Sequence, residues 1–220
     1  MLRAERRHWQ DGRARVAGLD EAGRGPLAGP VVAAAVILDA RFAEAELERE
    51  LGLLTDSKKL SETRRESFSE LLQNSSFVEI GVGFSEVEEI EELNILNATH
   101  LAMARAVRDL SALPDHILVD GLPVGGLPCP STPIVGGDAR SLSIAAASVV
   151  AKVVRDHCMQ EVDRLYPQYG FARHKGYGSR VHIQALFEHG PCPIHRRTFR
   201  PVREAAAIRL RNPVGRERDS

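Results

Sequence analysis

The sequence predicts one α/β domain, a mixed β-sheet with helices on its faces and an added helical segment near the C-terminus. Two apolar segments, Val16 to Asp20 and Val31 to Leu38, flank a glycine- and proline-rich stretch, as the strands of a hairpin do. Later segments alternate between strand and helix patterns, which is typical of a sheet covered by helices. The length of 220 residues, with 43% hydrophobic residues, fits one globular domain that needs no disulfide or metal to fold.

The first half of the chain carries this hairpin and two helices. Residues 1–15 read as a loosely held, charged arm. Ser61 can cap a helix that runs to about Gln73, with Leu60 packing back onto it as a staple. A third strand is predicted at Phe77 to Phe84. A helix is expected from about Asn94, because suitable residues recur every three or four positions: Leu93, Leu96, His100, Met103, Val107 and Leu110.

The second half alternates strands and helices before a loop-rich region. His116 to Asp120 is a buried strand that ends on a carboxylate, and a short strand follows at Thr132 to Val135. A long helix rich in alanine and valine is expected from about Leu142 to Leu165. The remainder is predicted as a loop-rich stretch to Arg200 with one helix near 180–188, a helix at 202–211, and a frayed polar tail from Asn212.

Charge and composition exclude several classes of protein. The 29 basic and 30 acidic side chains nearly cancel, so the chain is no histone-like polycation, although positive charge can still gather locally. No apolar run approaches the ~20 residues of a membrane span, and the basic N-terminus has no apolar stretch typical of a signal peptide. Three cysteines, Cys129, Cys158 and Cys192, show no pairing pattern. They are expected to be reduced thiols in a cytoplasmic protein.

Four carboxylates stand where apolar strands end. Asp20 and Glu21 close the first strand, Asp120 closes the fourth, and Asp138 sits in a Gly-Gly-Asp turn before the long helix. Carboxylates brought together raise one another's pKa and resist joint ionisation, and a divalent cation reverses that balance. Oxygen ligands without histidine or cysteine favour Mg²⁺ or Mn²⁺ over zinc. The alternative is that each acid merely forms a turn beside glycine, but the placement of all four after apolar segments argues against it.

Successive residues of a regular strand face opposite sides, so Asp20 and Glu21 should not both point into one site. We expect the strand to end or bulge at Glu21, since Ala22-Gly23 follows and permits the side chain to turn back.

Three further segments are candidates for substrate binding. Gly23-Arg24-Gly25 allows close backbone approach and supplies a bidentate phosphate donor, although a tight turn is the alternative. A phosphate-binding face is predicted on the long helix, where cationic and hydroxyl side chains share one side: Ser148, Lys152 and Arg155. Lys58 and Lys59 add positive charge from a polar loop at residues 55–61. Ordinary solvated surface is the alternative there.

Two loops near the C-terminus are harder to interpret. His174 to Gly178 interleaves basic, aromatic and glycine residues, a plausible surface for stacking on a sugar or base, or an ordinary loop. His189, Cys192 and His195 have a spacing compatible with zinc, but they lack a fourth partner, so a structural loop is favoured.

In their order along the chain, these segments closely resemble bacterial ribonuclease HII. The similarity runs from about Val16 to Val202. It is carried by AGLDEAGRGPLAGPV at 17–31, DSKKLSETRR at 56–65, ELNILNATHLAM at 92–103, ILVDG at 117–121, GDARSLSIAAASVVAKVVRD at 137–156 and YPQYGFARHKGYGS at 166–179. The resemblance implies a ribonuclease H-like fold with a C-terminal helical segment. It implies a catalytic domain at 16–202, preceded by the arm at 1–15 and followed by a helix and tail at 203–220.

The resemblance also implies the site and its substrate. Asp20, Glu21, Asp120 and Asp138 match the family's catalytic, metal-binding carboxylates. Gly23, Arg24 and Gly25 match the motif that contacts the ribonucleotide 2′-hydroxyl, and Tyr177 matches the tyrosine that helps sense the RNA–DNA junction. The implied substrates are RNA–DNA hybrids and DNA duplexes containing ribonucleotides, as DNA replication and repair would supply. The family usually has a lysine directly before Gly-Asp, where this chain has Gly136, so charge assistance from that position is lost.

The expected reaction is metal-dependent hydrolysis of a phosphodiester by two Mg²⁺ or Mn²⁺ ions ~4 Å apart. It would leave 5′-phosphate and 3′-hydroxyl ends. Two rivals remain open: a nucleic-acid-binding module without catalysis, and a metal-dependent nuclease that cuts DNA or another phosphodiester. No membrane partner is expected, and a monomer is the default.

Overall fold

The computed structural model describes residues 1–47 and 60–211 and has a five-stranded sheet at its centre, with strand order β3-β2-β1-β4-β5. The first three strands form an antiparallel meander, whereas β4 and β5 run parallel to β1. The predicted mixed sheet is therefore confirmed. The strands are β1 (Val16–Ala22), β2 (Val31–Leu38), β3 (Val78–Ser85), β4 (His116–Asp120) and β5 (Ser131–Ile134).

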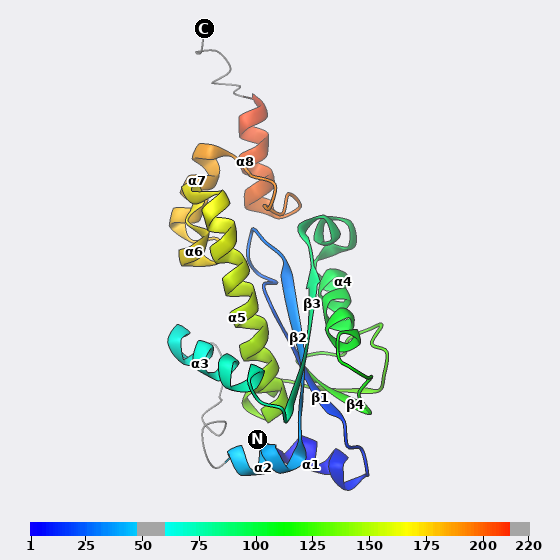
Figure 1. The fold of residues 1–220 in the computed structure, drawn as a ribbon. Coiled ribbons are helices and arrows are strands. Elements are labelled where there is room, and N and C mark those ends of the chain that lie inside the picture. The colour runs from blue at the N-terminus through cyan, green and yellow to red at the C-terminus, as the bar shows by residue number, and fades with distance from the viewer. Residues whose placement is uncertain (48–59, 212–220) are drawn as a thin grey trace.

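Helices cover both faces of this sheet (Figure 1). The long α5 packs on one face against β1 and β2, and α4 packs on the other against β2 and β3. The helices are α1 (Arg3–Gln10), α2 (Ala40–Leu47), α3 (Glu62–Gln73), α4 (Val87–Arg108), α5 (Leu142–Leu165), α6 (Phe171–His174), α7 (Arg180–His189) and α8 (Arg200–Arg211), with short 3₁₀ helices η3 (Gly137–Ala139) and η4 (Pro167–Tyr169).

The apolar run of β2 is explained by burial on both faces. All eight of its residues are buried. Ala34, Val36 and Leu38 join the core under α5, whereas the alternate residues Ala33 and Ala35 join the core under α4. This alternation follows from the two-residue period of a strand, and it makes β2 the central partition between the two hydrophobic layers.

Helix α5 lies unusually close to β1 because Gly18 has no side chain. A Cβ at Gly18 would overlap the backbone of Ser143 in the first turn of α5. The helix begins and ends where the sequence predicts, with Ser141 as its N-cap. Close packing along this line brings the first half of α5 beside the carboxyl end of β1, where the candidate carboxylates lie.

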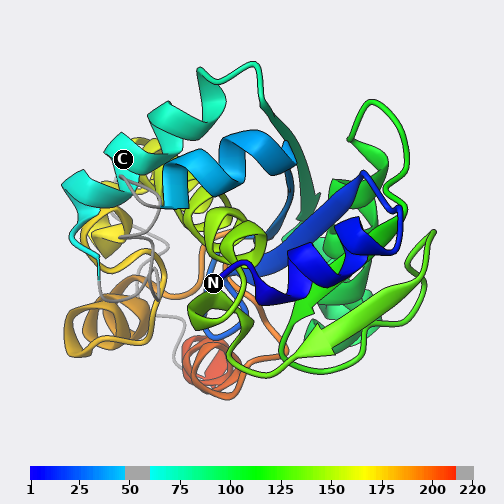
Figure 2. The same ribbon diagram turned by 90° about the horizontal axis from the view of Figure 1, so that it is seen from below.

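The expectation of a loosely held arm at 1–15 is wrong. Residues 3–10 form α1, and the N-terminus lies beside the start of α5 (Figure 2), where the Met1 carbonyl accepts the N–H of Leu142. Leu2 and Glu5 are buried. Glu5 Oε1 accepts hydrogen bonds from Ser141 Oγ at 2.6 Å, Ser143 Oγ at 2.8 Å and the Ser143 N–H at 3.0 Å. The arm is thus anchored through a buried carboxylate, which no apolar pattern reveals.

The predicted helix after β3 exists but begins seven residues earlier, at Val87. Glu86 and Glu89 form a reciprocal capping box at its start. Asn94 adopts φ +68°, a kink inside the helix, so residues on its two sides do not share one continuous face. Leu96 is half exposed, whereas Met103, Val107 and Leu110 are buried as the periodicity predicts, together with Ala98 and Ala102.

The chain after α5 forms the predicted C-terminal helical segment. Tyr169 and Phe171 pack with Met159 of α5 in a third apolar cluster. Leu27, from the loop between β1 and β2, packs with Leu186 of α7 and Val202 of α8. The segment therefore rests on the β1–β2 loop. None of the helices in the described part of the chain is long and apolar enough to cross a bilayer.

Candidate active site

Asp20 and Glu21 lie near the carboxyl end of β1 on regular strand geometry. Asp20 pairs opposite Ala34 and Glu21 opposite Ala33, and the pairing continues through Ala22. The predicted bulge at Glu21 is therefore wrong. Asp20 is buried on the side of α5, whereas Glu21 is half buried and bonded through Oε1 to Arg24 Nη1 at 3.2 Å.

Asp120 and Asp138 are brought to the same edge by the parallel pairing of β4 with β1. Leu19 pairs with Val119, so Asp20 and Asp120 follow at neighbouring strand ends. Asp120 Oδ1 accepts the N–H of Gly137 at 2.7 Å. This bond ties η3, which carries the half-buried Asp138, to the end of β4. Asp20 and Asp120 thus stand at neighbouring strand ends, and Asp138 lies in the turn that is bonded to Asp120.

Burial and charge repulsion both act on Asp20 at this edge. Burial raises the pKa of Asp20 well above its ordinary value, and the charges of Glu21 and Asp120 raise it further. A hydrogen bond from Ser148 of α5 opposes the shift, as does the N–H of Glu21, 2.7 Å from Asp20 Oδ1. A cation placed here would relieve both the burial of charge and the repulsion.

The donor set fits a hard divalent cation by its chemistry. It consists of carboxylate oxygens, which Mg²⁺ and Mn²⁺ prefer. Across the described residues, no three His, Cys, Asp or Glu side chains are already gathered as closely as a closed metal site requires. Asp20 interacts with Glu21 and Asp120, and Asp138 lies on the short helix that is bonded to Asp120 through Gly137.

A pocket of about 180 Å³ opens beside Asp20 and Glu21. The Gly23-Arg24-Gly25 turn, Ser148, Lys152 and Tyr177 complete its lining. Gly23 adopts φ +99°, a conformation that favours glycine. Tyr177 is half exposed, and its ring stands against Gly25. The structure therefore brings most of the predicted substrate-binding residues to one pocket with two of the carboxylates.

Arg155 does not belong to the predicted phosphate-binding face. It is 1% exposed, and its guanidinium donates to the carbonyls of Pro30, Lys175 and Ala28 at 3.0 to 3.1 Å. Arg155 lies seven residues, about two helical turns, after Ser148 on α5. At that position it is under the β1–β2 loop and not in the pocket. The assignment of Arg155 as a phosphate ligand is wrong, because its donors are already satisfied by backbone.

The other cations predicted to bind phosphate have different positions. Lys152 lines the pocket, and its Nζ lies 2.5 Å from Asp156 Oδ1. Burial lowers the pKa of Lys152, and the bond to Asp156 opposes that shift. Lys58 and Lys59 lie outside the described residues.

Arg196 is a structural residue that sequence reasoning missed. It is fully buried and donates five hydrogen bonds of 2.6 to 3.0 Å to carbonyls of the β1–β2 loop, those of Gly23, Arg24, Pro26 and Gly29. Burial lowers its pKa to about 9, and the nearby charge of Arg155 contributes. No local signal marks Arg196, because its partners lie about 170 positions earlier in the chain.

A histidine relay holds the loop that carries Tyr177. His182 Nδ1 lies 2.9 Å from the Tyr177 carbonyl, and His182 Nε2 lies 3.0 Å from His195 Nε2. His195 Nδ1 accepts the N–H of Cys192. A carbonyl can only accept, so His182 carries its proton on Nδ1 and His195 on Nε2. His189 is not part of this chain of bonds, and the structural reading of the His189–Cys192–His195 spacing is favoured over zinc.

Together, a mixed sheet with acids at the ends of its central parallel strands and a flanking helix define a ribonuclease H-like fold with a candidate hydrolase site. The family model of ribonuclease HII matches residues 17–202. The chain belongs to the ribonuclease HII family, which consists of metal-dependent endoribonucleases with ribonuclease H activity, acting on RNA–DNA hybrids.

Relatives and solved structures agree with this assignment. The chain is 52% identical over 208 residues to the ribonuclease HII of Desulfitobacterium hafniense, covering 94% of this chain and 77% of that protein. The crystal structure of ribonuclease H2 from Pyrococcus horikoshii superposes with a TM-score of 0.74 at 28% identity, covering 90% and 100% of the two chains. A structure of Bst-RNase HIII in complex with Mn²⁺ gives 0.72 at 18% identity, with 91% and 71% coverage, and shows the same fold.

Proposed function

We propose that this chain hydrolyses the RNA strand of RNA–DNA hybrids and incises duplex DNA at embedded ribonucleotides, leaving 5′-phosphate and 3′-hydroxyl ends. One observation carries the proposal. Asp20 is buried and repelled by Glu21 and Asp120, beside a pocket lined by the Gly-Arg-Gly turn and Tyr177. A buried acid that is repelled by two neighbouring carboxylates, at the edge of a polar pocket, is suited to cation-dependent chemistry. In a purely structural role such an acid would only destabilise the fold.

Asp20, Glu21, Asp120 and Asp138 would hold two divalent cations. Bound Mg²⁺ or Mn²⁺ supplies a water of lowered pKa and stabilises charge on the departing 3′ oxygen. Mn²⁺ in the related ribonuclease HIII structure supports a cation of this class. In this chain, Ser148 orients Asp20 by hydrogen bonding, and the bond from the Gly137 N–H orients Asp120. These two bonds leave the remaining carboxylate lone pairs for ligation.

Selectivity for ribonucleotides is assigned to the turn at Gly23–Gly25. Its backbone groups would satisfy the 2′-hydroxyl, the group that separates RNA from DNA. Arg196 holds the turn's carbonyls from the buried side, so the exposed side is fixed in shape before substrate arrives. Tyr177, half exposed across the pocket, would stack at the RNA–DNA junction.

Lys152 is the pocket cation that we assign to a substrate phosphate, while Ser148 acts through Asp20. Lys58 is retained as a proposed phosphate ligand on its sequence alone. We further propose that the chain acts as a monomer.

A cleavage assay with three matched duplexes tests this function. We expect the hybrid and the single-ribonucleotide duplex to be cut in Mn²⁺ or Mg²⁺ and not in EDTA, while the all-DNA duplex is spared. Asp20→Asn should lower turnover by at least about a hundredfold while duplex binding persists, because the substitution removes ligand charge without removing binding contacts. Glu70→Gln, an exposed change on α3, is the control.

Three outcomes would contradict the proposal. Equal cutting of all-DNA duplex would point to a general phosphodiesterase, and binding without cutting would point to a binding module. Near-normal cleavage by Asp20→Asn in Mg²⁺ would remove Asp20 from the chemistry.

A further inference from the structure

The arginines of the N-terminal segment line a groove that the proposed chemistry does not use. The groove, about 1090 Å³ in volume, lies between α1 and the β4–β5 edge of the sheet. Asp11 is the one acidic side chain among its described lining residues. In a chain whose charges nearly cancel overall, this is a marked local excess of positive charge. The basic lining consists of Arg3, Arg6, Arg7, Arg13, Arg140 and His8.

The acidic and basic side chains of α1 lie on different sides of the helix. Glu5, the acidic residue of the helix, is buried and accepts hydrogen bonds from the N-terminus of α5. Arg6 is paired with Glu44 of α2. Arg3 and Arg7 are exposed and make no side-chain hydrogen bond or ion pair within residues 1–47 and 60–211. Because Glu5 anchors the helix, the Arg3 and Arg7 guanidinium groups are held on a fixed helix without a partner among the described residues.

The groove reaches the candidate active site through η3. Arg140 lines the groove and follows Asp138 by two residues. One residue separates the two, so their Cα atoms lie within about 7 Å of each other. The same short helix is bonded to Asp120 by the Gly137 N–H. A polyanion held at the carboxylates would therefore continue directly past Arg140.

The length of the basic surface suits a nucleic-acid backbone. The eight residues of α1 span about 12 Å at 1.5 Å per residue. Phosphates follow one another at ~3.4 Å per strand along a duplex axis, so about three or four would pass the helix. Arginine is the side chain best suited to such contacts, because its planar fork matches phosphate oxygens.

We infer that this arginine groove binds the phosphodiester backbone of the substrate duplex, on the side of the cleavage site where Asp138 lies. The inference rests on the proposed function, since it takes the same duplex as the ligand. It extends the footprint beyond the pocket at Asp20 and gives the N-terminal segment a role in substrate affinity. An acidic peptide is a different class of partner, and the continuity with Asp138 favours the duplex.

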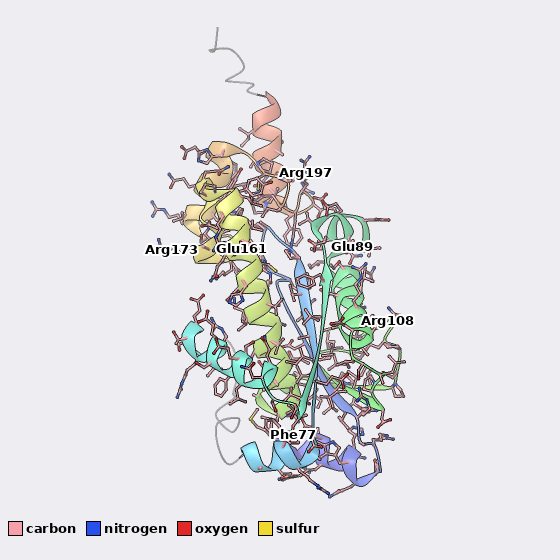
Figure 3. The ribbon with its side chains drawn as sticks, viewed as in Figure 1. Phe77, Glu89, Arg108, Glu161, Arg173 and Arg197 are labelled. Atoms are coloured by element: carbon pink, nitrogen blue, oxygen red, sulfur yellow. The ribbon has the colours of Figure 1, made fainter. Side chains whose placement is uncertain are left out.

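The test compares Arg3→Gln/Arg7→Gln with Arg108→Gln/Arg164→Gln, which removes equal charge elsewhere. Arg108 lies on α4, on the face of the sheet away from α5 (Figure 3), and Arg164 lies near the end of α5. Binding is measured by fluorescence anisotropy in EDTA, with a hybrid of about 20 bp (two helical turns) and with versions shortened from either end. Matching melting temperatures establish that all variants are folded.

We expect Arg3→Gln/Arg7→Gln to raise the Kd for the long hybrid about tenfold at 0.1 M salt. The slope of log K against log salt should fall by about 2, one for each lost phosphate contact. Hybrid shortened from one particular end should bind wild type and variant equally, because it no longer reaches the groove. The control variant should bind every duplex like wild type.

An unchanged Kd and slope would overturn the inference, as would an equal loss of affinity for every shortened hybrid. If a glutamate-rich peptide binds the protein through Arg3 and Arg7 without lowering its affinity for the hybrid, the inference is overturned in favour of an acidic partner. Wild-type cleavage of the same hybrid in Mn²⁺ is measured alongside. That cleavage tests the proposed function by itself, so either idea can fail while the other stands.

Discussion

Buried arginines without carboxylate partners shape the substrate side of this molecule. Neither Arg155 nor Arg196 makes an ion pair with a carboxylate in the part of the chain that the structure describes. Each guanidinium is satisfied by backbone carbonyls, and both bind carbonyls of the loop between β1 and β2. Because a forked cation can hold several carbonyls at fixed angles, Arg196 fixes the Gly-Arg-Gly turn at Gly23 and Arg24, whereas Arg155 fixes the end of the loop at Ala28 and Pro30.

Arg196→Lys is expected to lower the free energy of unfolding by about 3 kcal/mol. A lysine ammonium cannot reach four carbonyl groups at once, so buried acceptors are left without donors. Urea denaturation measures the loss. Arg197→Lys is the matched control, since Arg197 is the next residue, is exposed and is labelled in Figure 3. Equal stability of the two variants would contradict this account.

At the scale of elements, helix α1 and the start of α5 form one unit. Glu5 accepts three hydrogen bonds from the first turn of α5 and its N-cap. A carboxylate beside a helix N-terminus also benefits from the positive end of the helix dipole. The turn that bears Asp138 immediately precedes this cap.

Glu5→Ala should therefore destabilise the fold by about 2–4 kcal/mol and speed hydrogen exchange at residues 141–144. Glu5→Gln keeps an acceptor oxygen and should lose less. Glu44→Ala, which removes an exposed partner of Arg6, should change exchange at 141–144 little. Unaltered exchange in Glu5→Ala would show that the anchor does not hold the turn.

Elements governed by local apolar patterns were predictable. The unbroken run of β2 and the alanine-rich α5 appear within the predicted bounds, and strand-end acids identified Asp20 and Asp120. Elements governed by remote polar contacts were not. Helix α1 turns a glutamate inward, so it shows no apolar stripe, and Arg155 and Arg196 look like surface cations until distant carbonyls surround them. The helical periodicity predicted the buried residues Met103, Val107 and Leu110 but neither the start of the helix at Val87 nor the kink at Asn94.

At the scale of the whole molecule, stability should fall in mild acid. Burial lowers the pKa of His182 to about 4 and that of His195 to about 3, against about 6.5 when exposed. His116 is also buried, and its pKa is lowered to about 4 for the same reason. Below pH 6.5 these imidazoles therefore bind protons in the unfolded chain but not in the folded chain. The stability that these three imidazoles contribute above pH 6.5 is lost as pH falls toward 4, at a slope of at most about 4 kcal/mol per pH unit.

Urea denaturation at pH 7, 6 and 5 checks this slope. His195→Asn should reduce the slope, because one of the three buried imidazoles is gone. His157→Gln, at an exposed position on α5, should retain it. A wild-type stability that is flat between pH 7 and 5 would show that the relay titrates normally.

The dependence of the β1–β2 loop on Arg196 has a consequence for dissection of the enzyme. Fragments split between the two would each contain half of a single hydrogen-bonded unit, and neither half could keep its carbonyls or its guanidinium satisfied. The C-terminal segment is thus no accessory that can be trimmed or exchanged independently of the loop. Any chimera that borrows one must import its counterpart from the same parent.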